Sequence, residues 1–106
     1  LYGHRNDIDG YASAIEAFDK ALPELISAMG ENDIMMITAD HGCDPCYPGT
    51  DHTREYIPLV AVGKHVKPVS LGTRETFADI GATVLDYLTG EEWSAGSSML
   101  RDFYMD

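Results

Sequence analysis

Apolar residues follow two rhythms along this chain, and the first rhythm is helical. Over residues 8–29 they recur every three or four positions, which predicts an amphipathic helix with one face toward a core. Asp7 or Asp9 can cap its start, and Gly30 suits the position just past its end. Pro23 has no N–H to donate, so we expect a kink or a restart of the helix there.

A second helical stripe occupies residues 76–88. Thr73 or Thr76 can cap its start, and Gly90 stops it. The remaining segment, residues 91–106, predicts a short helical turn that docks on the core through a small apolar set. That set is Met99, Leu100, Phe103 and Tyr104.

The second rhythm is a continuous apolar run, which predicts strands. Such runs occur at Ile34–Thr38 and Tyr56–Val62, with Pro58 at a strand start or on an edge. A strand that lacks alternation is typical of a sheet covered on both faces, as parallel sheets are. Residues 42–51 and 64–72 are rich in Gly or Pro and predict loops. The order of elements therefore predicts an α/β fold with a mostly parallel sheet flanked by helices.

Composition narrows the class of protein. The 106 residues, 44% of them hydrophobic, suffice for one small folded domain. A formal net charge of −11 would repel a phosphate backbone, so we expect no nucleic-acid partner. No apolar run approaches the roughly 20 residues that span a bilayer, so we expect no membrane association. Two cysteines make no disulfide framework, which favours a reducing, cytoplasmic compartment.

Candidate metal ligands follow the first predicted strand directly. Asp40 and His41 lie at its carboxyl end, where open α/β sheets bind ligands. Adjacent strand residues point to opposite faces, so both side chains reach one site only if the chain bends, and Gly42 permits a bend. His52 follows across the loop, and Asp51 beside it can ligate or orient the imidazole.

Two further histidines differ in their surroundings. His4 adds a third imidazole in the N-terminal loop, whereas we expect His65 to be solvated. Oxygen and imidazole ligands together suit Mn, Zn or Fe. Arg5 and Arg54 lie beside His4 and His52, and each can either meet a phosphate or pair with an acidic surface neighbour. We interpret these residues as half of a metal site.

Cys43 and Cys46 form a C-x-x-C pattern just after a strand. This spacing allows a thioredoxin-type redox pair or half of a structural zinc site. A redox pair wants its first thiol at a helix N-terminus, and the Pro48 region cannot start a helix. We interpret the pair as incidental, and a thiol redox module stays open as an alternative function.

With these residues assembled, the chain resembles the phosphopentomutases, which belong to the alkaline-phosphatase-like metalloenzyme superfamily. The Asp40-His41-Gly42 motif is shared across that superfamily, and the flanking segments are more specific. The matching segments are residues 2–7, 38–45 and 49–59, with residues 71–74 and 77–83 resembling a late helix of the family.

The resemblance implies an isomerase with two manganese ions, acting in pentose phosphate and nucleotide metabolism. It would move a phosphoryl group between the C1 and C5 oxygens of ribose or deoxyribose through a phosphothreonine. By the family pattern, Asp40 and His41 hold one metal, and His4 and His52 hold the other. Two cations about 3.5–4 Å apart can clamp the attacking and leaving oxygens and neutralise the transferring group.

Several parts of the family pattern have no counterpart in residues 1–106. These are an Asp just upstream of His4, a further Asp and the phosphothreonine near the family's N-terminus, and the cap domain that grips the sugar phosphate. We therefore expect the C-terminal part of a core domain, with no catalytic nucleophile of its own. Alone it should be inactive, bind metal weakly and self-associate through bare strand edges, or pair with the missing N-terminal part. A phosphoglycerate mutase of the cofactor-independent type, a phosphoesterase or a non-catalytic metal-binding domain remain alternatives.

Overall fold

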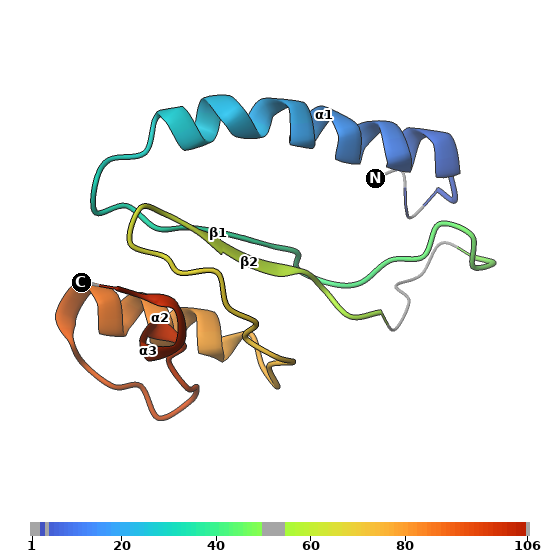
Figure 1. Ribbon diagram of the computed structural model, residues 1–106. Coiled ribbons are helices and arrows are strands. Elements are labelled where there is room, and N and C mark those ends of the chain that lie inside the picture. The colour runs from blue at the N-terminus through green and yellow to red at the C-terminus, as the bar shows by residue number, and fades with distance from the viewer. Residues whose placement is uncertain (1–2, 4, 50–54, 106) are drawn as a thin grey trace. The chain divides into compact units, whose positions relative to one another are not determined.

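The computed structural model describes residues 3, 5–49 and 55–105 (Figure 1). Two compact units divide the chain, Leu1–Lys64 and His65–Asp106. The first unit holds helix α1 (Ile8–Ser27) and strands β1 (Met35–Thr38) and β2 (Leu59–Val62). The second holds helices α2 (Ala78–Thr89) and α3 (Leu100–Phe103). All the elements expected from the sequence are present, with bounds shifted by one to three residues at most ends.

Helix α1 begins as expected, and it ends earlier than expected. The Asp7 carboxylate caps it by accepting a hydrogen bond of 2.9 Å from the Gly10 N–H. The helix continues through Pro23, so of the expected kink or restart the restart is wrong, and a kink stays a prediction. Its C-cap is Ala28 in a right-handed conformation, and Gly30 does not have the left-handed φ that a glycine cap would use. The Gly30 N–H instead donates to the Asp33 carboxylate.

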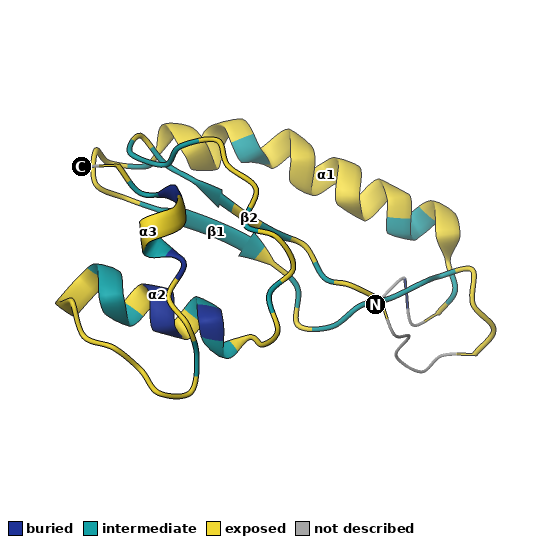
Figure 2. Cartoon of the chain, turned by 60° about the horizontal axis from the view of Figure 1, so that its bottom comes forward, coloured by how far each residue is buried: buried dark blue, intermediate teal, exposed yellow. Residues whose placement is uncertain are grey.

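The apolar stripe of α1 is only partly covered. The helix contains no buried residue, and Figure 2 shows it almost wholly in the colour of exposed residues. Five of its large apolar side chains are 45–57% exposed: Ile8, Ile15, Phe18, Leu25 and Ile26. The sequence pattern thus predicted the helix and its amphipathic character, whereas the expected burial of that face is wrong within the part of the chain that the structure describes.

Strands β1 and β2 form an antiparallel pair, which corrects the expected parallel arrangement. Met35 lies opposite Val62, and Thr38 lies opposite Leu59. A parallel pair would need a crossover of a dozen or more residues, usually a helix. The described residues between the strands contain no helix. The continuous apolar run was therefore a misleading signal, because β1 and β2 residues are half-buried or exposed rather than covered on both faces.

The antiparallel register places the end of β1 beside the start of β2. Pro58 directly precedes β2, as expected, and its carbonyl accepts a hydrogen bond of 2.8 Å from the Thr38 hydroxyl at the end of β1. The carboxyl end of β1 therefore lies beside the start of β2. Whatever follows Thr38 and whatever precedes Pro58 share one end of the strand pair.

The second unit has a small true core. Ala82, Met99 and Phe103 are its buried apolar residues, and Figure 2 shows buried positions on α2 and α3. The terminal segment docks as expected, because the Lys67 N–H donates to the Phe103 carbonyl at 2.7 Å. Gly90 ends α2 in the left-handed conformation expected of it, with φ of 75°.

The ends of this unit are joined through His65. Its carbonyl accepts a hydrogen bond of 2.6 Å from the Met105 N–H, and its ring lies 5.9 Å from that of Tyr104. His65 is half-buried, so the expectation of a solvated side chain is wrong.

Candidate metal centre

The structure describes two of the four predicted metal ligands. Asp40 and His41 follow β1 and lie at the end of the strand pair where the loop begins. His4 and His52 lie outside the described residues, as do Asp51 and Arg54. Arg5 is described and is exposed in the loop before α1.

The backbone next to His41 sets which ring nitrogen can bind a metal. Its Nδ1 lies 2.8 Å from the Gly42 carbonyl oxygen, which can only accept, so Nδ1 carries the proton. In the neutral ring, Nε2 then holds the lone pair. Nε2 lies 3.7 Å from Asp40 Oδ2, and a divalent cation about 2.1 Å from each atom can bridge that separation. The pair thus has the tautomer and spacing of two ligands to one ion.

Gly42 lets two parts of the loop come together. A Cβ at Gly42 would lie 2.5 Å from the carbonyl oxygen and from the Cβ of Glu55. Such contacts are impossible without moving the backbone, so the close approach requires glycine at this position. The contact holds Glu55, which precedes β2, against the Asp40-His41 turn.

The N-terminal loop is attached to the same place. Gly3 is buried, and a Cβ there would collide with the Cys43 sulfur and lie 3.2 Å from the Tyr11 ring. The Asn6 side-chain amide donates a hydrogen bond to the Gly49 carbonyl. The described residues Gly3 and Asn6 before α1, and Glu55 before β2, therefore each contact the chain that follows β1.

A hollow of about 660 Å³ opens beside this turn. One wall is the apolar face of α1, and the other contains polar groups of the loop. Its lining includes Tyr11, Ile15, Phe18, Asp40, His41, Cys43 and Glu55. Carboxylate and imidazole groups at the mouth of a partly apolar hollow are a usual arrangement for ligand binding.

The donor chemistry of the described residues fits a divalent cation, but the ligand set is incomplete. No group of three or more His, Cys, Asp or Glu side chains suited to a metal occurs among residues 3, 5–49 and 55–105. Asp40 and His41 supply one oxygen and one nitrogen, half of a four-ligand shell. Asn6 adds an unusual feature, a buried Oδ1 with no hydrogen-bond partner in the described part of the chain. The contribution of Asn6 was missed by the sequence analysis.

The two cysteines are free thiols. Cys43 is half-buried against Gly3, and Cys46 is exposed in a turn where its N–H donates to the Asp44 carboxylate at 2.9 Å. No helix begins among the described residues 44–49 and 55–77 that follow them, so the pair lacks the helix N-terminus that would activate a redox thiol. Their interpretation as an incidental pair stays a prediction.

The second unit contains a buried ionic cluster that the sequence analysis did not identify. Arg74 Nε donates to Asp79 Oδ2 at 2.8 Å, and the Ser97 N–H donates to Asp79 Oδ1 at 3.0 Å. The Ser97 hydrogen bond lowers the pKa of the Asp79 carboxyl, Arg74 lowers it further, and burial opposes both. Spacing alone gave no signal for this cluster, because Ser97 lies far along the chain from α2.

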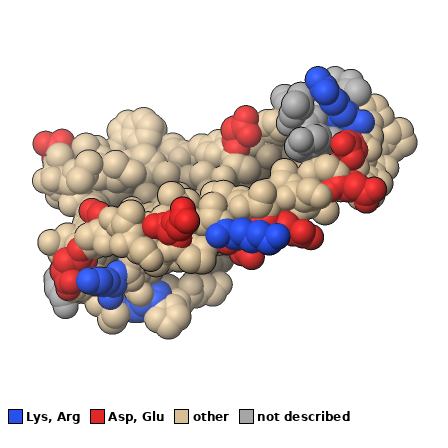
Figure 3. All heavy atoms as spheres, turned by 90° about the horizontal axis from the view of Figure 1, so that it is seen from above, with Lys and Arg blue, Asp and Glu red and all other residues tan. Residues whose placement is uncertain are grey.

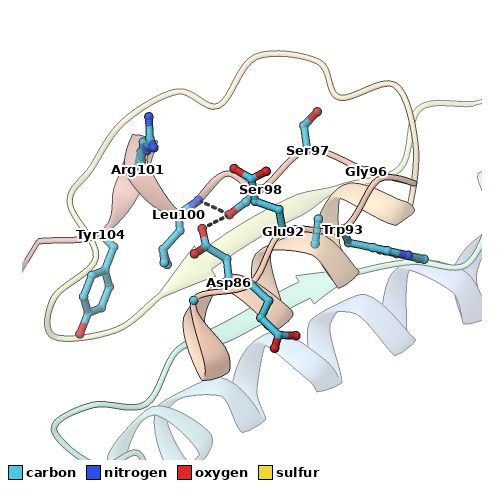
Figure 4. A pocket seen from close by; sticks show the side chains of 12 residues that line it. Asp86, Glu92, Trp93, Gly96, Ser97, Ser98, Leu100, Arg101 and Tyr104 are labelled. Atoms are coloured by element: carbon cyan, nitrogen blue, oxygen red, sulfur yellow. Dashed lines mark hydrogen bonds between the residues drawn. The ribbon is translucent and has the colours of Figure 1, made fainter.

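A separate hollow of about 700 Å³ lies in the same unit (Figure 4). At its centre the Ser98 hydroxyl donates to Asp86 at 2.7 Å and accepts from the Leu100 N–H at 3.2 Å. Neither Asp40 nor His41, the two predicted ligands that the structure describes, lines it. Its polar groups thus attach the segment before α3 to helix α2. The candidate metal centre belongs to the first unit.

The surface agrees with the charge expected from composition. Figure 3 shows acidic side chains spread over the visible face, with Lys and Arg at only a few places and no broad basic patch among the atoms described there. Within the described residues, no helix is both long enough and apolar enough to cross a membrane.

Comparison with known proteins identifies the family. A family model described as the Metalloenzyme superfamily matches residues 1–92. Phosphopentomutases of Yersinia enterocolitica and Yersinia pseudotuberculosis are each 59% identical to this chain over 99 residues. That alignment covers 93% of this chain and 24% of each relative, so the chain spans about a quarter of their length. Through the family match, which covers most of its residues, this chain belongs to the metalloenzyme superfamily.

Proposed function

We propose that this chain supplies part of the metal centre of a phosphopentomutase. The whole enzyme would interconvert the 1-phosphate and 5-phosphate of ribose or deoxyribose through a phosphothreonine. The observation that carries the proposal is the Asp40–His41 pair, with a fixed tautomer and 3.7 Å between its ligand atoms. The 59% identity to phosphopentomutases over 93% of the chain supports this substrate class.

The proposed roles follow the family resemblance. Asp40 and His41 bind one cation, His4 and His52 bind the second, and manganese is the metal. The two cations would neutralise the transferring phosphoryl group and orient its oxygens. Nδ1–H of His41 donates a hydrogen bond to the Gly42 carbonyl, which leaves the Nε2 lone pair to bind the cation. Asp51, Arg5 and Arg54 are secondary candidates that orient an imidazole or contact phosphate.

The proposed fold of the whole enzyme is an alkaline-phosphatase-like core, of which residues 1–106 form the C-terminal part. Large sheets that are otherwise parallel often carry an antiparallel strand at their edge. We place β1 and β2 in such a mixed, mostly parallel sheet. The rest of the enzyme would cover the exposed apolar face of α1 and supply the phosphothreonine. The free thiols of Cys43 and Cys46 support a cytoplasmic location.

Turnover by the full-length enzyme tests the substrate class. Ribose 1-phosphate and ribose 5-phosphate should interconvert, whereas 3-phosphoglycerate should be left unchanged. Conversion of phosphoglycerate alone, or hydrolysis to inorganic phosphate alone, would replace this proposal by the phosphoglycerate mutase or phosphoesterase alternative. A variant with Cys43→Ser and Cys46→Ser should keep its turnover, and loss of turnover together with insulin reduction by the wild type would favour the thiol redox alternative.

Metal removal tests the centre itself. Dialysis against a chelator should abolish turnover of the full-length enzyme, and Mn²⁺ should restore more of it than Zn²⁺ or Fe²⁺. His41→Ala should weaken activation by Mn²⁺ by at least about 10–100-fold, because a positioned ligand is lost. His65→Ala is the matched control, since His65 lies in the other unit, and it should leave Mn²⁺ activation unchanged. Full activity after chelation would contradict a metal mechanism.

A further inference from the structure

Asn6 combines three unusual features in the loop before α1. Its φ of 54° is the only positive value among non-glycine residues in the described ranges. Its side-chain amide reaches across to the carbonyl of Gly49. Its Oδ1 is buried and has no hydrogen-bond partner among the residues that the structure describes. Left-handed backbone is costly for most residues and is tolerated best by glycine and asparagine, so the conformation itself selects this residue type.

The orientation of the Asn6 carboxamide follows from its partner. A backbone carbonyl can only accept, so the atom that faces Gly49 must be the NH₂ group and not the oxygen. The Asn6 N–H donates to the Gly3 carbonyl at 3.1 Å, which closes the turn on the other side. Asn6 therefore joins the loop that carries His4 to the loop that follows Asp40 and His41.

The Asn6 Oδ1, which has no partner within the described ranges, indicates that a further group binds between the two loops. Nearly all buried polar atoms in proteins have a partner, and an exception is commonly explained by an ion, a water or a functional role. Asn6 Oδ1 belongs to the segment before α1, which also carries the predicted ligand His4. The segment is hydrogen-bonded to the loop that follows Asp40 and His41. A hydrogen-bond donor arriving with the bound ligand would satisfy it.

We propose that Asn6 is a positioning residue of the metal centre, which clamps the turn before α1 to the loop of residues 43–49 through Nδ2 and leaves Oδ1 for a hydrogen-bond donor that arrives with the bound ligand. This inference rests on the metal centre of the proposed function. It goes beyond that function because Asn6 ligates no metal in it. The clamp sets the distance between ligands that come from separate parts of the chain.

Substitution of Asn6 in the full-length enzyme separates the side chain from the backbone. Asn6→Gly keeps the left-handed conformation and removes the carboxamide, whereas Asn6→Ala also strains the backbone. With Mn²⁺ alone as the probe, followed by its electron paramagnetic resonance signal, Asn6→Gly should lower affinity about 10–100-fold. Asn32→Gly, in the turn before β1 and away from the site, is the matched control and should bind like wild type.

Hydrogen exchange of the metal-free protein provides a second readout. Amides of residues 43–49 should exchange faster in Asn6→Gly than in wild type or Asn32→Gly, at a temperature where circular dichroism shows all three folded. Unchanged Mn²⁺ affinity in Asn6→Gly overturns the proposal, because a merely structural residue would behave that way. If wild type binds no Mn²⁺, the metal centre of the proposed function fails and the positioning role fails with it, while faster exchange would still establish the clamp.

Discussion

The Gly42 carbonyl accepts a hydrogen bond from Nδ1 of His41, and the absence of a Gly42 side chain makes room for the backbone of Glu55. Gly42 thus orients the imidazole of a candidate metal ligand and leaves space for Glu55. Asn6 and Gly3 act in a similar way on the N-terminal loop, through a hydrogen bond to Gly49 and a contact with Cys43. At this scale the candidate site depends on residues that hold ligands in place as well as on the ligands.

Gly42→Ala tests the close approach to Glu55. The new Cβ would overlap the Glu55 backbone, so the loop must open, at a cost of about 1–3 kcal/mol in the free energy of unfolding. We expect a lower melting temperature and weaker Mn²⁺ binding by the full-length enzyme. Gly30→Ala is the control, because its Cβ would meet only the flexible Asp33 side chain, at 3.3 Å. Wild-type Mn²⁺ affinity in Gly42→Ala would show that this contact does not shape the site.

The helices differ in what holds them in place. Helix α2 is attached to the following segment by two buried polar residues, Asp79 and Thr83. The Thr83 hydroxyl donates to the Asp79 carbonyl at 2.7 Å and accepts from the Met99 N–H at 2.9 Å. Helix α1 has a capped start and no buried residue. The second unit is therefore held by its own contacts, whereas α1 depends on whatever covers its apolar face.

Asp79→Asn tests the ionic attachment of α2. Loss of the charge facing Arg74, which is buried to more than three quarters, should reduce the free energy of unfolding by about 1–3 kcal/mol at pH 7. Urea denaturation measures the change. Asp102→Asn, an exposed position on α3, is the control and should have little effect. Equal stability of Asp79→Asn and wild type would show that the cluster contributes nothing net.

The pH dependence of the same cluster has a defined sign. Because the folded state lowers the pKa of Asp79, the unfolded state binds its proton more readily. The stabilisation is fully present above the unfolded pKa of about 3.9 and is lost as pH falls through the lower folded value. The difference in unfolding free energy between wild type and Asp79→Asn should therefore shrink on acidification from pH 5 to pH 2. A difference that grows over that range would contradict the direction of the shift.

The whole chain leaves much apolar surface uncovered in its first unit. Helix α1 exposes a row of large side chains, and the hollow beside it has apolar walls. Exposed apolar area of this kind on a folded protein usually marks an interface or an aggregation liability. Relatives about four times longer have ample further chain with which to cover such a surface.

The 106-residue chain alone should therefore self-associate and show no mutase turnover. Light scattering coupled to gel filtration should give a mass above that of a monomer. Ile15→Gln should reduce association, because Ile15 is an exposed apolar residue at the hollow, and Glu16→Gln beside it should not. A stable monomer, or measurable turnover by the chain alone, would contradict this prediction.

Local pattern alone was sufficient for the elements and for part of the site. Helical periodicity, the Asp7 cap, the Gly90 stop and the strand with Asp40 and His41 at its end all depend on neighbours in the chain, and the structure confirms each of them. The family resemblance also came from short motifs, and the comparisons confirm it. Each of these features is determined by residues close together in the chain, through secondary-structure propensity and helix capping.

Pairing direction, burial and the contacts between loops needed the three-dimensional structure. The antiparallel register of β1 and β2 and the links from Asn6 to Gly49 and from Ser97 to Asp79 join residues that are distant in the chain. The uncovered face of α1 likewise depends on which distant segments pack against it. An apolar run has the same pattern in a parallel or an antiparallel strand, and an amphipathic stripe has the same pattern whether or not something covers it. Local preferences leave those alternatives nearly equal in energy, and packing between distant segments chooses among them.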